Sequence, residues 1–350
     1  MRVVLSSLLA FVIGVACTKL PNEDFYPEIA DSTEVIWVAN EGNFNSNNAS
    51  ITAYAIKEEA VAQQYFKSKN NIELGDVAND IELYGSKVYV IVNNSSTIEI
   101  LDKNTGLRIK QLQLIKDGIN RSPRQIVFSN GKGYVSNFDG SIGVLDTSSL
   151  TFEQFVQAGE NPDGIGIAKG KLFVANSGGL NFPNYDKTVS VFLLPSMQKD
   201  TTLTVTLNPT GIFISDDEDV YIASQGNYSN IKPKLSRIDA STYIVKQNFD
   251  LTVNDMDFYK NTAYISSYDF NTSTSIIYKL DELTNQLVTQ SLPELKTLNA
   301  IKIDPITGYI YCMDANGYTQ SGKVYCYNTE WKLLFQFGTG LIPGDLIFIN

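Results

Sequence analysis

Side chains suited to binding a polar solute recur in the loop-like segments of this 350-residue chain. They are Asn amides, aromatic rings and two arginines. Amides pair with the carbonyl and amide groups of a ligand, and rings supply flat apolar contact, so the set suits a large, polar, roughly planar ligand. Asn and Gly in loops also serve the backbone alone. The candidate ligand-binding residues are Asn43, Phe44, Asn93, Arg121, Arg124, Asn137, Phe138, Asn176, Phe182, Tyr185, Tyr228, Tyr268, Phe270 and Tyr318.

The range of catalytic mechanisms open to this protein is limited, because the chain contains no histidine. Serine and cysteine hydrolase mechanisms that use imidazole are therefore excluded, as are metal sites that rely on it. Carboxylates remain as candidates for a metal-dependent enzyme. They are Glu41, Asp76, Asp80, Asp163, Asp255 and Asp314. Aspartates of this kind commonly bind nearby backbone amides, so we expect no enzyme activity, no metal and no cofactor.

The charge of the chain excludes one class of partner. Its formal net charge is −11, and its 27 Lys and Arg residues are scattered along the sequence. Nucleic-acid binding needs clustered basic residues that neutralise phosphates. We therefore expect no nucleic-acid partner.

A repeated strand-like motif provides the framework for these residues. An aromatic residue begins each of seven similar segments, whose starting positions lie 52, 45, 39, 48, 43 and 47 residues apart. The segments are WVAN at Trp37, YVIV at Tyr89, YVSN at Tyr134, FVAN at Phe173, YIAS at Tyr221, YISS at Tyr264 and YCMD at Tyr311. This spacing fits four short strands with their turns, which is the period of a propeller blade.

The order within each repeat predicts an all-β, seven-bladed β-propeller with four-stranded blades over residues 35–350. A short apolar strand precedes every motif after the first, and two further strands follow each motif. The first repeat lacks its own first strand, and DLIFIN at residues 345–350 resembles the missing piece. We expect this C-terminal strand to pair with the N-terminal blade and close the ring, which leaves no long exposed edge.

Propeller geometry also predicts where the candidate binding residues lie. Loops between the second and third strands, and loops joining consecutive blades, open on the same face of a propeller. The loops of the first kind are long and rich in Asn, Gly and aromatic residues, as in NSGGLNFPNYDKT at residues 176–188. The turns expected on the opposite face are short. We therefore expect the binding site on the loop-rich face.

The N-terminus reads as a secretion signal. Residues 1–16 combine one arginine with an apolar stretch, and Cys17 follows Gly14, Val15 and Ala16. This resembles a bacterial lipoprotein signal, in which cleavage before the cysteine is followed by its acylation. An ordinary cleaved signal with an incidental cysteine is the alternative. Residues 17–34 are polar and contain proline, which suits a flexible tether from acylated Cys17.

Two further cysteines lie on neighbouring strand-like segments. Cys312 is in YIYCMD, and Cys326 is in VYCYN. An oxidising envelope permits a disulfide between them, but the geometry of cross-strand bridges is demanding. A Cys312–Cys326 disulfide and two buried thiols both fit the sequence.

The repeat motif resembles the YVTN repeat of YncE-like propellers. Shorter motifs give a more specific resemblance to the DUF5074 lipoproteins, a family that includes the cobalamin-binding surface protein BtuG. They are NEGN at Asn40, GDVAND at Gly75, RSPR at Arg121, NPDG at Asn161, ANSGG at Ala175, YDKTVSV at Tyr185, NP at Asn208 and GNY at Gly226.

The resemblance implies a role in solute uptake. It implies a lipoprotein anchored in the outer membrane and exposed at the cell surface, which captures cobalamin or another corrinoid and passes it to a TonB-dependent outer-membrane transporter. The residues alone equally suit a siderophore, haem or a glycan as ligand. A protein-interaction scaffold that uses the same loops is a further alternative.

Overall fold

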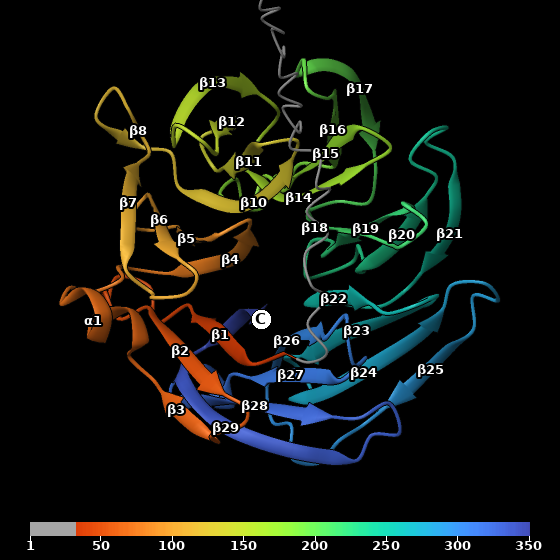
Figure 1. Ribbon diagram of the computed structural model, residues 1–350. Helices are drawn as coiled ribbons and strands as arrows, with labels where there is room; N and C mark the ends of the chain where they lie inside the picture. The colour runs from red at the N-terminus through yellow and green to blue at the C-terminus, as the bar shows by residue number, and fades with distance from the viewer. Residues whose placement is uncertain (1–32) are drawn as a thin grey trace, which may run out of the picture. The chain divides into compact units, whose positions relative to one another are not determined.

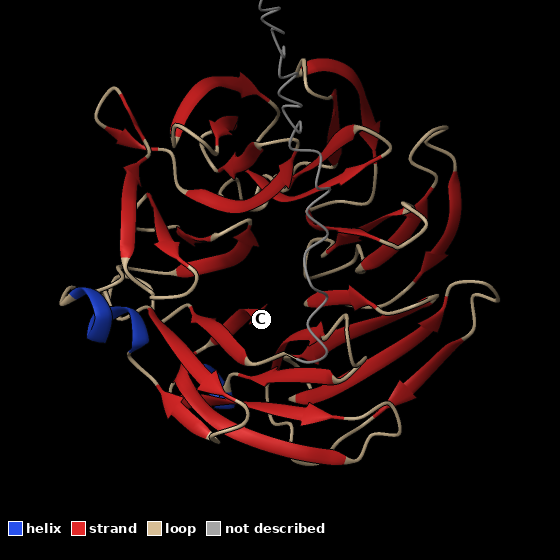
Figure 2. Cartoon of the chain, in the orientation of Figure 1, coloured by secondary structure: helices blue, strands red, loops and turns tan. Residues whose placement is uncertain are grey.

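The computed structural model describes residues 33–350. The expected signal peptide, Cys17 and most of the expected tether lie outside the described residues. Seven four-stranded antiparallel sheets form a ring around a central channel (Figures 1 and 2). The predicted seven-bladed β-propeller is therefore confirmed. Within residues 33–350, no helix has the length and apolar character needed to cross a membrane.

The blades are numbered here in chain order, and each is given from its inner to its outer strand. Blade 1 contains β30 (Pro343–Ile349), β1 (Val35–Asn40), β2 (Ser50–Ala55) and β3 (Ala60–Ala62). Blade 2 contains β4 (Ala78–Tyr84), β5 (Lys87–Val92), β6 (Thr97–Asp102) and β7 (Arg108–Gln113). Blade 3 contains β10 (Pro123–Ser129), β11 (Lys132–Asn137), β12 (Ser141–Asp146) and β13 (Thr151–Gln157). Blade 4 contains β14 (Pro162–Ala168), β15 (Lys171–Asn176), β16 (Thr188–Leu193) and β17 (Gln198–Thr204).

The remaining blades follow the same order. Blade 5 contains β18 (Pro209–Ile214), β19 (Val220–Ser224), β20 (Lys234–Ile238) and β21 (Val245–Phe249). Blade 6 contains β22 (Asp255–Phe258), β23 (Thr262–Asp269), β24 (Thr274–Asp281) and β25 (Leu287–Gln290). Blade 7 contains β26 (Leu298–Ile303), β27 (Ile310–Asp314), β28 (Ser321–Tyr327) and β29 (Leu333–Leu341). Outside the blades lie the hairpin of β8 (Ile115–Lys116) and β9 (Ile119–Asn120), the helix α1 (Tyr65–Asn70) and the 3-10 turn η1 (Asn316–Tyr318).

The repeated aromatic residues are the second or third residue of the second strand in every blade. All seven are buried, with no more than 3% of any residue exposed. They belong to hydrophobic clusters made of residues from two adjacent blades, and the structure has one such cluster at each of the seven junctions. The ring is thus held together by apolar packing between neighbouring sheets, which is why the motif recurs once per blade.

The two ends of the described chain meet in blade 1. β30 pairs antiparallel with β1, so that Val35 lies opposite Ile349 and Trp37 opposite Ile347. Leu346 of β30 is fully buried in the cluster between blades 7 and 1. The last strand of the chain is therefore the innermost strand of the first blade.

A second kind of contact joins the inner strands around the channel. In four blades, the residue just before the first Ile, Leu or Met of the inner strand accepts a backbone N–H from the next blade. Asp345 accepts from Ile81 at 3.3 Å, Asp80 from Ile126 at 2.7 Å, Gln125 from Ile165 at 3.3 Å and Asp255 from Ile301 at 3.0 Å. Blade 4 has Gly164 at this position, where a Cβ atom would lie 2.6 Å from the backbone of blade 5.

The structure decides between the two alternatives for the cysteines. Cys312 lies opposite Tyr325, and Cys326 lies opposite Tyr311, so the two cysteines are one position out of register. Successive side chains of a strand point to opposite faces, and the two thiols enter different hydrophobic clusters. Both are free and buried, and the Cys312–Cys326 disulfide is therefore ruled out. Burial raises the pKa of Cys326 to about 12.

Reducing agent should leave the stability of the folded protein unchanged. Because both thiols are free, the melting temperature with dithiothreitol should stay within about 1 °C of the value without it. Reduction of a structural disulfide would instead cost about 2–5 kcal/mol in the free energy of unfolding. Thermal denaturation followed by circular dichroism measures this. A fall of several degrees would show that the thiols are bridged.

Truncating Leu346 to Ala should weaken the ring at the blade 7 to blade 1 junction. Removing a fully buried leucine side chain costs about 2–5 kcal/mol in the free energy of unfolding. Leu334→Ala is the control, because Leu334 lies on the outer strand β29 and is 40% exposed. Urea denaturation should show a much larger loss for Leu346→Ala, and equal losses would contradict the role given to β30.

Candidate functional site

A pocket of about 790 Å³ opens where loops of blades 5 and 6 meet the ends of inner strands near the channel. Its lining residues come from the two kinds of loop that the sequence places on one face. They are Arg124, Asp163, Thr210, Gln225, Tyr228, Ser229, Ile231, Lys232, Pro233, Thr252, Asn254, Tyr268, Asp269, Phe270 and Asn271. Four of the candidate ligand-binding residues are among them, namely Arg124, Tyr228, Tyr268 and Phe270.

An ion pair lies on the channel side of this pocket. The Nε atom of Arg124 lies 2.9 Å from Oδ1 of Asp163, and the guanidinium lies 4.6 Å from the ring centre of Phe138. Burial raises the pKa of Glu41, and the positive charge of Arg124 opposes that shift. Arg124 is therefore held in place by Asp163 and Phe138 and keeps only 22% of its side chain exposed. It offers a fixed, largely neutralised hydrogen-bond donor to a ligand.

Two groups of aromatic rings lie beside the pocket. In the first, Tyr185 is edge-on to both Phe182 and Tyr228, with ring centres 6.0 and 6.1 Å apart. In the second, Phe270 stacks on Tyr318 with ring centres 5.9 Å apart, and it is edge-on to Tyr268 at 4.9 Å. Tyr228 and Phe270 are 71% and 70% exposed. Three of the rings, Tyr228, Tyr268 and Phe270, line the pocket itself.

Amide side chains fix the loops that carry these rings. Asn254 accepts the backbone N–H of Tyr268 at 2.9 Å. Gln225 donates to the carbonyl of Val253 at 2.8 Å, which ties the blade 5 loop to the start of blade 6. The Nδ2 atom of Asn208 lies 3.4 Å from the hydroxyl of Tyr228. The pocket wall is therefore fixed by hydrogen bonds within blades 5 and 6 and by one that joins them.

Thr210, Gln225, Lys232 and Asn254 line the pocket but were missed by sequence reasoning. A repeat signal marks two of them. Arg124, Asp163, Thr210 and Asn254 all occupy the position two residues before the first Ile or Met of an inner strand. In three of these blades the preceding residue is proline. Aligning the inner strands as well as the aromatic motifs would have identified this position.

Three of the predicted asparagines have a different role from the expected one. Asn137 and Asn176 are fully buried and donate to residues of their own sheets, such as Ser141 and Ser190. Asn93 is 9% exposed and donates to the carbonyl of Pro123 at 2.9 Å. These amides close the ends of strands and do not line the pocket.

Other predicted residues lie outside the pocket lining. Arg121 pairs with Asp139 at 2.5 Å and lies 3.8 Å from the ring centre of Phe155. Asn43 does not line the pocket, and its backbone N–H donates to Oδ1 of Asn48 at 2.8 Å. Phe44 is 67% exposed on the same loop. Four further predicted residues contact residues of the pocket lining or their neighbours but do not line the pocket themselves. They are Phe138, Phe182, Tyr185 and Tyr318.

The carboxylates considered for metal chemistry are spread over several environments. Asp314 accepts three backbone N–H groups, from Lys296, Thr297 and Asn316. Asp76 accepts from Asn94 at 2.8 Å. Asp163 pairs with Arg124, while Asp80 and Asp255 join the inner strands of neighbouring blades. This agrees with the expectation that they bind backbone and side-chain donors.

Solved structures share the fold at low sequence identity. A quinonprotein alcohol dehydrogenase-like protein from Bacteroides thetaiotaomicron is 14% identical, with a TM-score of 0.68 over 91% of this chain and 78% of that one. A protein from Lactobacillus plantarum is 13% identical, with a TM-score of 0.64 over 91% of this chain and all of that one. Hydrazine synthase from Kuenenia stuttgartiensis is 15% identical, with a TM-score of 0.64 over 76% of this chain and 88% of that one. Such identities support a common fold alone.

Comparison at the level of sequence identifies the family. The chain has no match among curated proteins. Residues 35–338, which include blades 2 to 6 complete and most of blades 1 and 7, match a family model described as a domain of unknown function, DUF5074. Because this match spans most of the chain, the protein belongs to the DUF5074 family.

Proposed function

We propose that this protein is an envelope lipoprotein that captures a large polar solute on the loop-rich face of its propeller. The ligand is cobalamin or another corrinoid, and the protein passes it to a TonB-dependent outer-membrane transporter. The observation that carries the proposal is the pocket of about 790 Å³ between two groups of aromatic rings, with Arg124 and Asp163 on its channel side.

The exposure of the rings supports binding. Tyr228 and Phe270 leave about 70% of their surface in water although their neighbours fix their positions. Apolar surface held rigidly at a pocket gains free energy when a flat ligand covers it, and little conformational entropy is then lost. A corrinoid offers a flat macrocycle with amide groups at its edge, which suits rings and amide donors together. The choice of corrinoid comes from the family resemblance.

The polar groups of the pocket support capture rather than catalysis. Of its acidic residues, Asp163 is paired with Arg124, and Asp269 accepts the N–H of Asn271. Hydrogen bonds to nearby residues lower the pKa of Asp269, so it is a poor general acid or base at neutral pH. Binding without chemical change is the simplest function of such a site.

Replacing Phe270 with Ala should weaken cobalamin binding by about tenfold, because the loss of an aromatic contact worth roughly 1.4 kcal/mol changes affinity tenfold. Isothermal titration of the folded protein with cyanocobalamin measures the change. Phe44→Ala is the matched control, since Phe44 is similarly exposed but does not line the pocket.

Three outcomes would count against the proposal in different ways. Absence of cyanocobalamin binding by folded wild-type protein would refute corrinoid capture. Tight binding of haem, a siderophore or a glycan in its place would assign the pocket to that ligand. Equal losses in Phe270→Ala and Phe44→Ala would move the site away from the pocket.

Replacing Cys17 with Ala should release the protein from the membrane, because the acylated cysteine is the expected anchor. Fractionation of cells that express each form measures this, and most of the variant should leave the membrane fraction. Surface labelling of the wild type then shows which way the anchored protein faces. Equal membrane retention of both forms would refute the anchor.

A further inference from the structure

A second, smaller cavity of about 250 Å³ lies in the channel and is lined by residues of all seven inner strands. Its charged residues are five carboxylates and one amine. They are Asp80 and Glu82 of β4, Asp255 and Asp257 of β22, Asp345 of β30, and Lys302 of β26. The other inner strands contribute uncharged residues, such as Gln125 of β10, Gly166 of β14 and Phe213 of β18.

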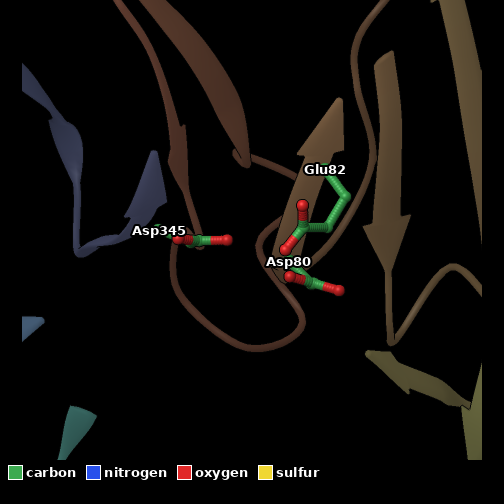
Figure 3. Close-up of side chains that lie close together, drawn as sticks. All are labelled: Asp80, Glu82 and Asp345. Carbon is green, nitrogen blue, oxygen red and sulfur yellow. The ribbon is translucent and has the colours of Figure 1, made fainter. Parts of the chain in front are cut away.

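The five carboxylates have a single positively charged side chain, Lys302, among the residues that line this cavity. Nζ of Lys302 lies 3.0 Å from Oδ1 of Asp345. Oxygen atoms of Asp80, Glu82 and Asp345 all lie within 4.8 Å of one another, and Figure 3 shows the three side chains facing each other. Within residues 33–350, no hydrogen bond or ion pair is formed by the carboxylate of Glu82. Full ionisation would therefore place several unbalanced negative charges in a confined space.

The same carboxylates join the blades. Asp345, Asp80 and Asp255 each accept a backbone N–H from the following blade, and Asp257 also accepts from Ile303 of β26 at 2.7 Å. Asp345 belongs to the strand that completes blade 1, and through Ile81 and Lys302 it contacts blades 2 and 7. Repulsion within the cluster therefore acts directly on the contacts that hold the inner strands together.

We propose that this channel cluster, defined as Asp80, Glu82, Asp255, Asp257, Lys302 and Asp345, makes the stability of the ring depend on pH. The ring is most stable in mildly acidic solution, where the cluster holds bound protons. It becomes less stable as Glu82 and Asp255 ionise toward pH 8.

The direction of the pKa shifts agrees with this geometry. Burial raises the pKa of Glu82 to about 7, with Asp345 and Asp257 adding to the shift and Lys302 opposing it. Burial likewise raises the pKa of Asp255 to about 7. A carboxyl group with a raised pKa binds its proton more tightly in the folded state. Its stabilising effect is complete below the unfolded-state pKa near 4, and it is lost as the pH rises through 7.

Few other groups of this protein titrate in the same pH range. The chain has no histidine, which is the usual source of titration between pH 5 and 8. Partly exposed turn aspartates such as Asp239, with a pKa lowered to about 2 by hydrogen bonds, titrate far below this range. Outside the channel cluster, burial also raises the pKa of Glu41, Glu99 and Glu282, and a nearby arginine opposes each shift. Variants of the channel cluster separate its effect from theirs.

The test is thermal unfolding of the full folded chain between pH 5.5 and pH 8. The melting temperature of the wild type should fall by roughly 3 °C or more over this range. In the double variant Glu82→Gln, Asp255→Asn the fall should be at least halved. The amide at residue 255 keeps an oxygen that accepts the N–H of Ile301, so the contact between blades 6 and 7 is preserved. Glu58→Gln is the control, because Glu58 is an exposed residue of blade 1.

Hydrogen exchange provides a second measurement. After correction for the intrinsic effect of pH on exchange, the amide of Ile81 should be less protected at pH 8 than at pH 5.5, and the double variant should reduce this difference. A wild-type melting temperature that stays constant from pH 5.5 to pH 8 would overturn the proposal. A fall of equal size in the wild type and the double variant would overturn it as well.

Discussion

The hydrogen bond from the backbone of one inner strand to a side chain of the preceding blade is the contact on which this structure depends. Inner strands of a propeller border an open channel, so one edge of each is left without a strand partner. Asp345, Asp80, Gln125 and Asp255 fill this gap by accepting an N–H from the next blade. An unpaired buried N–H would cost about 1–3 kcal/mol, so each contact stabilises the ring as well as setting the spacing of its blades.

This spacing in turn shapes the candidate site. Arg124 and Asn254 directly precede two of these acceptors, Gln125 and Asp255, and both line the pocket. Asp163 and Thr210, at the same position in blades 4 and 5, line it as well. Because the backbone at this position is fixed by contacts between blades, the side chains present a fixed set of polar groups. The loops from the second strands then place Tyr228 and Phe270 around them. Framework and site are therefore built from adjacent residues of the same strands.

The asparagines show how residue type can mislead when position is unknown. Asn93, Asn137 and Asn176 stand at the ends of second strands, where they bind backbone or hydroxyl groups inside the fold. Asn254 is similar in type, but it stands at the start of an inner strand and reaches the pocket. Burial and hydrogen-bond partners separate these roles, and neither can be read from composition. Of the predicted residues, the rings of Tyr228, Tyr268 and Phe270 line the pocket, and none of the predicted asparagines does.

The sequence by itself determined the repeat, the number of blades and the face that carries the long loops. These follow from local periodicity, since one aromatic residue per blade must be buried against the neighbouring sheet. The register of neighbouring strands was decided by the tertiary structure, and it places Cys312 and Cys326 on opposite faces of their sheet. The tertiary structure likewise brought five carboxylates and Lys302 together in the channel, although 265 positions separate Asp80 from Asp345 in the chain. Contacts of this kind depend on closure of the ring, which sets distances that no local pattern encodes.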